Sequence, residues 1–316
     1  MCSATVSAAS AAGRVVLGAH RRGAPAGALG RRLLGQRARA VSIRRPAWMA
    51  SPAGSFAPMA DRPPAVSVLT PVHRPQSRFL AQLHESLCEQ AAVDWEWAIQ
   101  IDGGRSLLRR VPHDIRQDSR VGLDANGRWL GQAVTRNIAL ARVRHDLLQT
   151  VDADDVLLPG ALAATARTLT SESDIALAFG RTSWLRSDGA RLPAKNPYPP
   201  GRIAAGRIAD DWRHRGGSCP IVVGSVMWRT SHIDAHGGWP AIVAGPDVML
   251  LLAVTTSHPA RHIETATYLY RSHTAQLHRG SLRFAMRPHY RRLTRRMLSA
   301  RKHAIPRDIT ATAPPT

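Results

Sequence analysis

Three carboxylates occupy four consecutive positions of the chain, directly after a short apolar segment. Asp152, Asp154 and Asp155 follow residues 147–151, whose composition is typical of a buried strand. In an open α/β sheet, ligands bind beyond the carboxyl ends of the strands, so acids at this place point toward a ligand. Mg²⁺ and Mn²⁺ prefer oxygen ligands and commonly combine one or two carboxylates with substrate phosphates. The Asp-x-Asp run therefore indicates a site for a divalent metal and a diphosphate.

The same acids have a second interpretation. Asp is favoured at helix N-caps and in first turns, and residues 156–162 would then form the helix that these acids begin. Taken alone, the run leaves both interpretations open.

The elements upstream favour the first interpretation. Residues 65–70 predict a buried strand that ends at Pro71, because proline cannot donate to a strand ladder. Residues 95–101 predict a second strand, which is also followed by an acid, Asp102, and residues 131–142 predict a helix entered through glycine. A further helix is predicted between the two strands by the helical spacing of Phe79, Leu80, Leu83 and Leu87. This alternation is typical of a doubly wound α/β fold.

Four separated motifs, in this order, resemble the family 2 glycosyltransferases of GT-A fold. They are residues 66–73, 100–104, 131–137 and 151–155. The resemblance implies an α/β fold with a Rossmann-like, mostly parallel central sheet and helices on both faces. It also implies an inverting enzyme that moves a sugar from a nucleoside-diphosphate sugar to an acceptor hydroxyl.

The resemblance also implies roles for individual residues. It assigns Mn²⁺ or Mg²⁺ to Asp152 and Asp154, with Asp155 beside them, and it brings His273 of the motif at 270–273 near the metal or diphosphate. A packing role for His273 stays open as an alternative. The residues implied in binding the nucleotide sugar are Pro71, Val72, His73, Asp102, Arg136, Asp152 and Asp154.

Sugar transfer also needs a base that takes the proton of the acceptor hydroxyl. In the family this base is the Asp of a Glu-Asp pair downstream of a Gly-Gly-aromatic loop, and the resemblance implies Asp247, after the loop at 237–239. Pro246 replaces the Glu, although proline suits the first position of a helix. Two alternatives remain: Asp247 is only a helix N-terminal charge, or the chain is a binding relative without activity.

The region between these motifs predicts further elements. Residues 177–185 and 191–192 flank a turn signal at 187–189, which predicts a hairpin. Residues 193–218 are rich in Pro, Gly and Arg without a clear period, so we expect a loop there.

The charge distribution predicts three regions. The formal net charge is +21, and residues 1–62 and 279–316 each contribute nine of it, which leaves +3 for residues 63–278. We expect a disordered Ala/Gly/Arg-rich tail at 1–62, a catalytic domain at 63–278, and a basic helical extension with a disordered C-terminus at 279–316. A nucleic-acid-binding protein would place its basic face on the folded module, so nucleic acid is not an expected partner, although an Arg-rich nucleic-acid-binding protein stays an alternative.

The C-terminal extension predicts a basic amphipathic helix over residues 281–303, starting near Pro288. Met286, Tyr290, Leu293 and Met297 would share one face, and arginines cover the rest. Such a helix packs on its own domain or makes peripheral contact with an anionic membrane. The sequence leaves the acceptor open among a sugar, a lipid-linked molecule and a small molecule.

The remaining signals concern location and rival activities. The spacing of Cys2, Cys88 and Cys219 matches neither a disulfide framework nor a zinc site, which fits a protein of the reducing cytoplasm. If the helix at 281–303 contacts a membrane, we expect that contact at the inner face. We expect translation to begin at Met49 or Met59. A nucleotidyltransferase is the rival enzyme, but it would carry a Gly-rich basic loop where this chain has residues 71–75.

Overall fold

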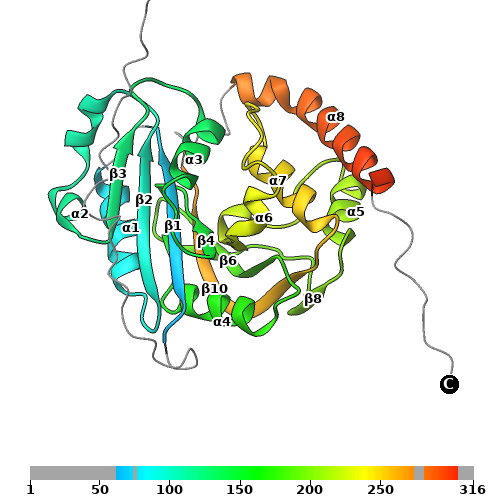
Figure 1. Cartoon of the computed structure of the whole chain (residues 1–316), viewed down its shortest axis with the longest axis horizontal. Coiled ribbons are helices and arrows are strands. Elements are labelled where there is room, and N and C mark those ends of the chain that lie inside the picture. Colours follow the sequence, from blue (N-terminus) through cyan, green and yellow to red (C-terminus); the bar gives the residue numbers. More distant parts are fainter. Residues whose placement is uncertain (1–61, 74–76, 274–280, 305–316) are drawn as a thin grey trace, which may run out of the picture. The chain divides into compact units, whose positions relative to one another are not determined.

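The central feature of the computed structural model is a ten-stranded sheet (Figure 1). The structure describes residues 62–73, 77–273 and 281–304. Eight strands follow the order β3-β2-β1-β4-β9-β6-β10-β5, and β7 and β8 pair with β6 and β10. The predicted tail at 1–62 lies outside the described residues except for Arg62.

The first half of the sheet is parallel. Its strands are β1 (Ala65–Val72), β2 (Asp94–Ile101), β3 (Val121–Ala125) and β4 (Leu147–Thr150), and β1 lies between β2 and β4. The connections contain α1 (Ser77–Cys88), a 3-10 turn η2 (Arg105–Arg110), α2 (His113–Gln117) and α3 (Gln132–Leu140). The carboxyl ends of parallel strands lie at the same end of the sheet, so Asp102 after β2 and Asp152 after β4 emerge there together.

The second half of the sheet is mixed. β9 (Val226–Arg229) runs antiparallel to both β4 and β6 (Leu177–Leu185), and β10 (Ala260–Arg271) runs parallel to β6. The remaining strands are β5 (Val156–Leu157), β7 (Arg191–Pro193) and β8 (Gly201–Ile203). The helices of this half are α4 (Ala161–Ser171), α5 (Arg207–His214), the 3-10 turn η3 (Val223–Ser225), α6 (Thr230–Asp234), α7 (Pro246–Thr255) and α8 (Ser281–Ala304). β6 and β7 form the predicted hairpin.

Two apolar cores lie on opposite faces of this sheet. Successive side chains of a strand point to opposite faces, and β1 accordingly sends Val68 into one core and Leu69 into the other. The first core contains Leu80 of α1 together with residues of α4, and the second contains Leu251 of α7 together with residues of α3 and α5. Each such buried side chain contributes about 1.5–3 kcal/mol, which fixes the helices on both faces.

One strand prediction needs correction. β1 continues through Pro71 to Val72, although proline was expected to end it. Val72 accepts a bond from Asp102 on the β2 side, so Pro71 faces the β4 side, where the ladder has already ended at Leu69. Its missing N–H therefore removes no bond from the sheet.

The acids after β4 do not cap a helix. Residues Val156–Leu157 form β5, and α4 begins only after Gly160, which has a φ of 73° and makes no side-chain cap bond. The helix-capping interpretation of the Asp-x-Asp run is therefore wrong, and the acids lie in a turn between two strands.

The segment 193–218 is more ordered than its composition predicts. It contains β8 and α5, and Ile208, Ala209 and Trp212 of α5 are buried. The apolar residues are few and surrounded by charges, so the period is weak in the sequence although the spacing of four still buries one face.

Helix α8 also differs from its prediction. It begins at Ser281 and contains Pro288 in its interior, where the proline removes one backbone bond without ending the helix. Tyr290 and Met297 of the predicted stripe pack against the second core, beside the buried Thr294 and Leu298, so the helix packs on its own domain. Leu293 of the same stripe is 43% exposed, so the packed face is shifted from the predicted one. None of the described helices is long and apolar enough to cross a membrane.

Candidate active site

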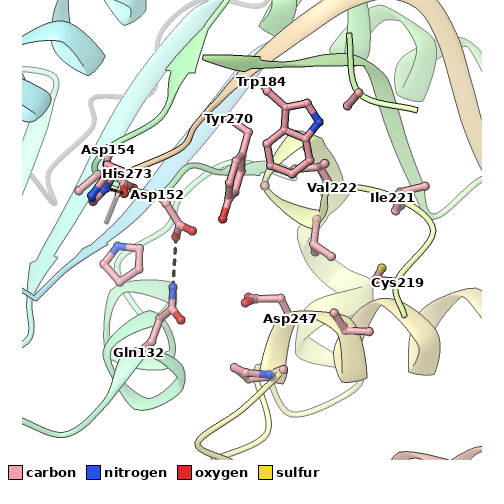
Figure 2. Close-up of a pocket in the computed structure, with 18 of the residues that line it drawn as sticks. Gln132, Asp152, Asp154, Trp184, Cys219, Ile221, Val222, Asp247, Tyr270 and His273 are labelled. Atoms are coloured by element: carbon pink, nitrogen blue, oxygen red, sulfur yellow. Dashed lines mark hydrogen bonds and ion pairs between the residues drawn. The ribbon is translucent and has the colours of Figure 1, made fainter. Parts of the chain in front are cut away.

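A cavity of about 1100 Å³ opens where the strands of both halves end. Figure 2 shows the carboxylates of Asp152 and Asp247 and the hydroxyl of Tyr270 pointing into the same space. Its wall includes several predicted site residues, namely Pro71, His73, Asp152, Asp154, Asp247 and His273. The structure thus brings together residues that are up to 202 positions apart, from Pro71 to His273.

Asp154 pairs with the predicted histidine. Asp154 follows β4, His273 follows β10, and the Nε2 atom of His273 lies 2.6 Å from Oδ2 of Asp154. Both side chains remain partly exposed, at 26% and 18% respectively. A carboxylate and an imidazole at one point of the wall can both donate electron pairs to a cation.

Asp155 has a different environment from its neighbours. It is 2% exposed, and its two oxygens accept bonds from the Tyr268 hydroxyl at 2.7 Å and the Arg271 amide at 2.8 Å. Burial raises the pKa of Asp155 well above its ordinary value, and the charges of Asp154 and Asp152 raise it further. With both oxygens occupied, Asp155 is a link between the turn and β10 and does not line the cavity.

Arg136 joins the two halves of the site. This α3 side chain is 4% exposed, donates to Asp152 at 2.7 Å, and makes a second ion pair with Asp247. Burial alone would lower the pKa of Arg136, but Asp247 and Asp152 raise it above its ordinary value. Burial raises the pKa of Asp152, an effect that Arg136 opposes and that Asp154 and Asp247 increase. The guanidinium therefore opposes the effect of burial on Asp152 and links this acid to Asp247.

Asp247 stands in the first turn of α7. Pro246 occupies the helix start, and Gly245 before it has a φ of 70°, which favours glycine. The ring of Tyr290 from α8 packs on Gly245 so closely that an added Cβ would lie 2.5 Å from it. The C-terminal helix thus fixes the turn from which Asp247 projects.

The predicted nucleoside-binding residues divide into two groups. Pro71 and His73 line the cavity, whereas Val72 is 1% exposed and belongs to the core. Asp102 does not line the cavity either, because its carboxylate accepts bonds from the Leu130 amide at 2.6 Å and the Gly131 amide at 3.0 Å. Asp102 therefore holds the loop before α3.

Several wall residues were not predicted from the sequence. Trp184 of β6 and Tyr270 of β10 make an edge contact with ring centroids 4.9 Å apart, and Gln132 donates to Asp152 at 3.2 Å. Outside the wall, Trp129 is 65% exposed beside His73. The sequence signal for these residues was weak. Aromatic residues lie next to predicted motifs, but only the tertiary fold shows which of them face the same space.

Comparison with known proteins identifies the family. The model of glycosyl transferase family 2 matches residues 67–232, which is more than half of the chain. The chain belongs to glycosyl transferase family 2. The matched part of this family 2 chain runs from β1 to α6, so Asp247 and His273 lie outside it.

Individual relatives agree with this assignment. The O-antigen biosynthesis protein RfbC of Myxococcus xanthus is 28% identical over 152 residues, which cover 48% of this chain and 12% of RfbC. An uncharacterized glycosyltransferase of Methanocaldococcus jannaschii is 26% identical over 136 residues, or 42% of this chain and 47% of that protein. This family 2 chain therefore matches less than half the length of either relative.

Solved structures support the fold. The structure of S. aureus TarS 1–349 in complex with UDP-GlcNAc superimposes with a TM-score of 0.59 at 13% identity, covering 75% of this chain and 66% of TarS 1–349. The predicted GT-A fold of this family 2 member is thereby confirmed.

Proposed function

We propose that this chain is a metal-dependent, inverting glycosyltransferase that moves a sugar from a nucleoside-diphosphate sugar to an acceptor hydroxyl. One observation carries the proposal: Asp152 and Asp154 from the parallel half and Asp247 from the mixed half face one cavity. Family membership supplies the reaction class, and the cavity supplies acids on two sides of the space for a donor.

The residues at the end of β4 fit a hard divalent cation. Asp152 and Asp154 offer carboxylate oxygens, and His273 adds a nitrogen that Mn²⁺ tolerates. We therefore propose Asp154, Asp152 and His273 as holders of Mn²⁺ or Mg²⁺, and we leave out Asp155 because its oxygens are already occupied. When bound, the ion neutralises the charge that develops on the leaving diphosphate.

Asp247 is the proposed base. Its carboxylate would accept the proton of the acceptor hydroxyl while that hydroxyl attacks the sugar from the side opposite the diphosphate. Arg136 binds Oδ1 of Asp247 and so orients the carboxylate. The same guanidinium ties this orientation to Asp152, at the proposed metal site.

The donor's nucleoside end would lie beside Pro71, His73 and the exposed ring of Trp129. Aromatic and imidazole rings offer faces on which the nucleobase of the donor can stack. Asp102 would act through the loop that it holds. TarS, which shares the fold, was solved with UDP-GlcNAc, so uridine-diphosphate sugars are the first donors to test.

The acceptor side includes a candidate membrane contact. The first turns of α8 expose Leu282 at 58% and Phe284 at 65%, and Arg287 lies over the Phe284 ring. Apolar side chains among arginines match the surface of an anionic bilayer, where each cation contributes about 1 kcal/mol. We propose that α8 brings the enzyme to the inner face of the membrane, where a lipid-linked acceptor would lie.

Vesicle sedimentation tests this contact. The full chain should sediment with anionic vesicles at low salt and be released as salt rises, and the Phe284→Ser and Arg287→Ser double variant should bind less. Equal sedimentation with neutral vesicles, or none with either, would reject the membrane contact without affecting the proposed reaction.

A panel of nucleotide sugars tests the reaction itself. With Mn²⁺, one donor should raise the melting temperature and be slowly hydrolysed, and EDTA should abolish both effects. Pyrophosphate release from a nucleoside triphosphate and a sugar phosphate would instead identify a nucleotidyltransferase. Stabilisation by a donor without hydrolysis or transfer, across a panel of acceptors, would identify a binding relative and overturn the proposal.

A further inference from the structure

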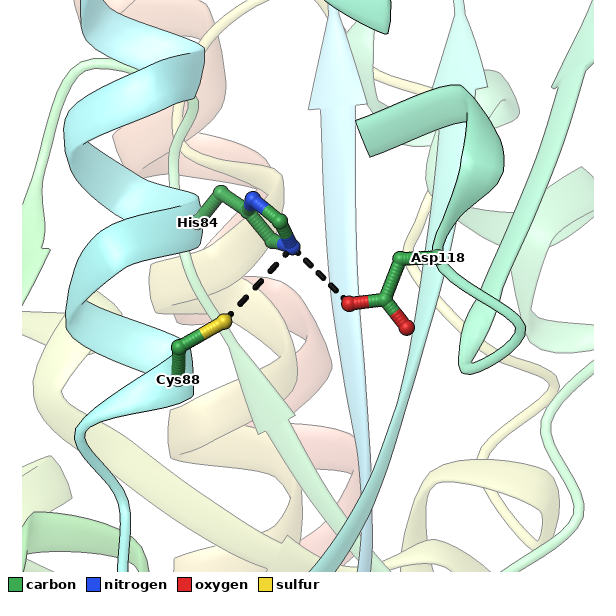
Figure 3. A group of neighbouring side chains, drawn as sticks. All are labelled: His84, Cys88 and Asp118. Carbon is green, nitrogen blue, oxygen red and sulfur yellow. Dashed lines mark hydrogen bonds and ion pairs between the residues drawn. The ribbon is translucent and has the colours of Figure 1, made fainter. Parts of the chain in front are cut away.

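A second group of potential ligands lies away from the cavity. His84 and Cys88 stand one turn apart on α1, and Asp118 follows α2 just before the edge strand β3. Figure 3 shows the three side chains converging in the space between α1 and this connection. None of them belongs to the cavity wall, and their potential ligand atoms all lie within 4.8 Å of one another.

The geometry of the three groups is that of ligands around one point. The Nε2 atom of His84 faces both partners, Oδ2 of Asp118 at 2.9 Å and Sγ of Cys88 at 3.7 Å. In a catalytic Cys-His-Asp relay the acid and the thiol use opposite ring nitrogens, because the proton passes across the ring. Here a single nitrogen serves both, so the cluster is no relay.

The surrounding residues hold the ligands in place. The His84 ring stacks on the buried ring of Trp97, with an interplanar angle of 15° and centroids 6.0 Å apart. The other oxygen of Asp118, Oδ1, accepts bonds from the amide of Arg120 at 2.9 Å and from its Nε at 3.0 Å. Metal-binding histidines and carboxylates are usually oriented by such outer partners.

The guanidinium of Arg120 is the one group that an ion must displace. Its Nη2 atom lies 2.8 Å from Oδ2 of Asp118 and 3.5 Å from Sγ of Cys88, in the position that a cation would take. The side chain is 43% exposed, so the whole guanidinium can swing toward solvent while the Arg120 amide keeps its bond to Oδ1. A positive group already occupies this place, which indicates that the three ligands form an electron-rich point.

We propose that His84, Cys88 and Asp118 bind a zinc-class divalent ion at a site separate from the active site. Thiolate, imidazole and carboxylate together suit Zn²⁺, whereas an oxygen-seeking Mg²⁺ would avoid the sulfur. The ion would tie α1 to the segment before β3, and its fourth position would remain for water. Cysteine spacing predicted no zinc site, because here one cysteine is completed by a histidine on the same helix and an acid 34 residues from that histidine.

Cobalt substitution tests the proposal in a background that lacks the proposed active-site metal. The full-length Asp154→Asn variant should bind one Co²⁺ or Zn²⁺ per chain, Co²⁺ should give a thiolate charge-transfer absorption, and Zn²⁺ should raise the melting temperature. Adding Cys88→Ala should remove the absorption and weaken Zn²⁺ binding by more than about 100-fold, since losing even an outer partner costs about 10- to 100-fold.

Two controls make the result specific. Cys219→Ala removes the partly buried thiol of the cavity wall and should leave the absorption unchanged. His84→Gln should lose Zn²⁺-dependent stabilisation while its far-ultraviolet circular dichroism stays that of the parent. Absence of the Co²⁺–thiolate absorption in the Asp154→Asn variant, or equal Zn²⁺ affinity after Cys88→Ala, would overturn the proposal and would leave the proposed glycosyl transfer untouched.

Discussion

The parallel half of the sheet, β3-β2-β1-β4, and the mixed half, β9-β6-β10-β5, contribute different chemistry to one cavity. The parallel half contributes Asp152 and Asp154, whereas the mixed half contributes Trp184, Tyr270 and, through α7, Asp247. Under the proposed function, the difference teaches that donor and acceptor functions would be separable: acids after parallel strands suit a metal and diphosphate, and an acid near aromatic rings suits a sugar hydroxyl.

The two halves also differ in how they are connected. Arg136 of α3 forms ion pairs with Asp152 and Asp247, so a single buried cation joins the two groups of acids. Variants that separate donor binding from transfer therefore test the comparison, and variants of Arg136 test the connection.

The largest expected effect is on the acceptor side. Asp247→Asn should lower transfer by about 10²- to 10⁴-fold, the usual value of a positioned general base, while donor and metal binding stay at the parent level. Asp234→Asn, an exposed acid of α6 in the same half, is the matched control and should transfer at the parent rate. Transfer at the parent rate in Asp247→Asn would show that another group is the base, and lost donor binding would assign Asp247 to the donor site.

On the donor side, neighbouring acids should behave differently. Asp154→Asn should lower Mn²⁺-dependent turnover by at least about 100-fold, because the charge on the leaving diphosphate is no longer compensated. Asp155→Asn should keep near-parent turnover, since an amide still accepts from the Arg271 amide and can donate to the Tyr268 hydroxyl. Equal losses in the two variants, measured as initial rates over a Mn²⁺ series, would contradict the separate roles of these acids.

The connecting residue should affect both sides at once. Arg136→Gln should weaken donor binding and lower transfer, each by about tenfold, because Asp152 and Asp247 then repel without compensation. Unfolding in urea should show a loss of about 1–3 kcal/mol, less than for a fully buried pair because both acids are partly exposed. Arg181→Gln, from an exposed pair with Glu264, should cost less than about 1 kcal/mol. If only one of binding and transfer changes, Arg136 does not couple the halves.

The smallest expected effect comes from α8. Tyr290→Ala removes the ring that packs on Gly245 and should loosen the turn before Asp247. The rate of transfer should therefore fall several-fold, and by no more than about tenfold. Tyr290→Phe keeps the ring and should transfer normally, and so should Leu293→Ala on the exposed face of the same helix. A Tyr290→Ala variant with parent kcat would show that α8 is dispensable for the base.

The parallel half could be predicted from the sequence because its signals are local. Apolar runs predicted β1, β2 and β4, the last two ending in acids, and the spacing of its leucines predicted α1. The register of Pro71 could not be predicted, since its effect depends on which neighbouring strand it faces. The same holds for Asp155, whose burial is decided by Tyr268 and Arg271 more than 100 positions away.

The mixed half was predicted less well for a related reason. α5 and the packed face of α8 depend on each other and on α7, as the contact between Trp212 and Tyr290 illustrates. Helices that bury a narrow face among arginines have a weak apolar period, so only the tertiary fold reveals which residues are packed. The link through Arg136 was missed because a motif names a residue without naming its partners.

Manganese binding measured by electron paramagnetic resonance tests the central claim most directly. In the Cys88→Ala background, which removes the thiol of the second cluster, uridine diphosphate should promote binding of one Mn²⁺ per chain. Asp154→Asn should abolish this binding, whereas Asp247→Asn should retain it and still fail to transfer sugar. Equal Mn²⁺ binding in the Asp154→Asn variant, or its loss in Asp247→Asn, would contradict the division of the cavity into a metal-binding donor side and a base-bearing acceptor side.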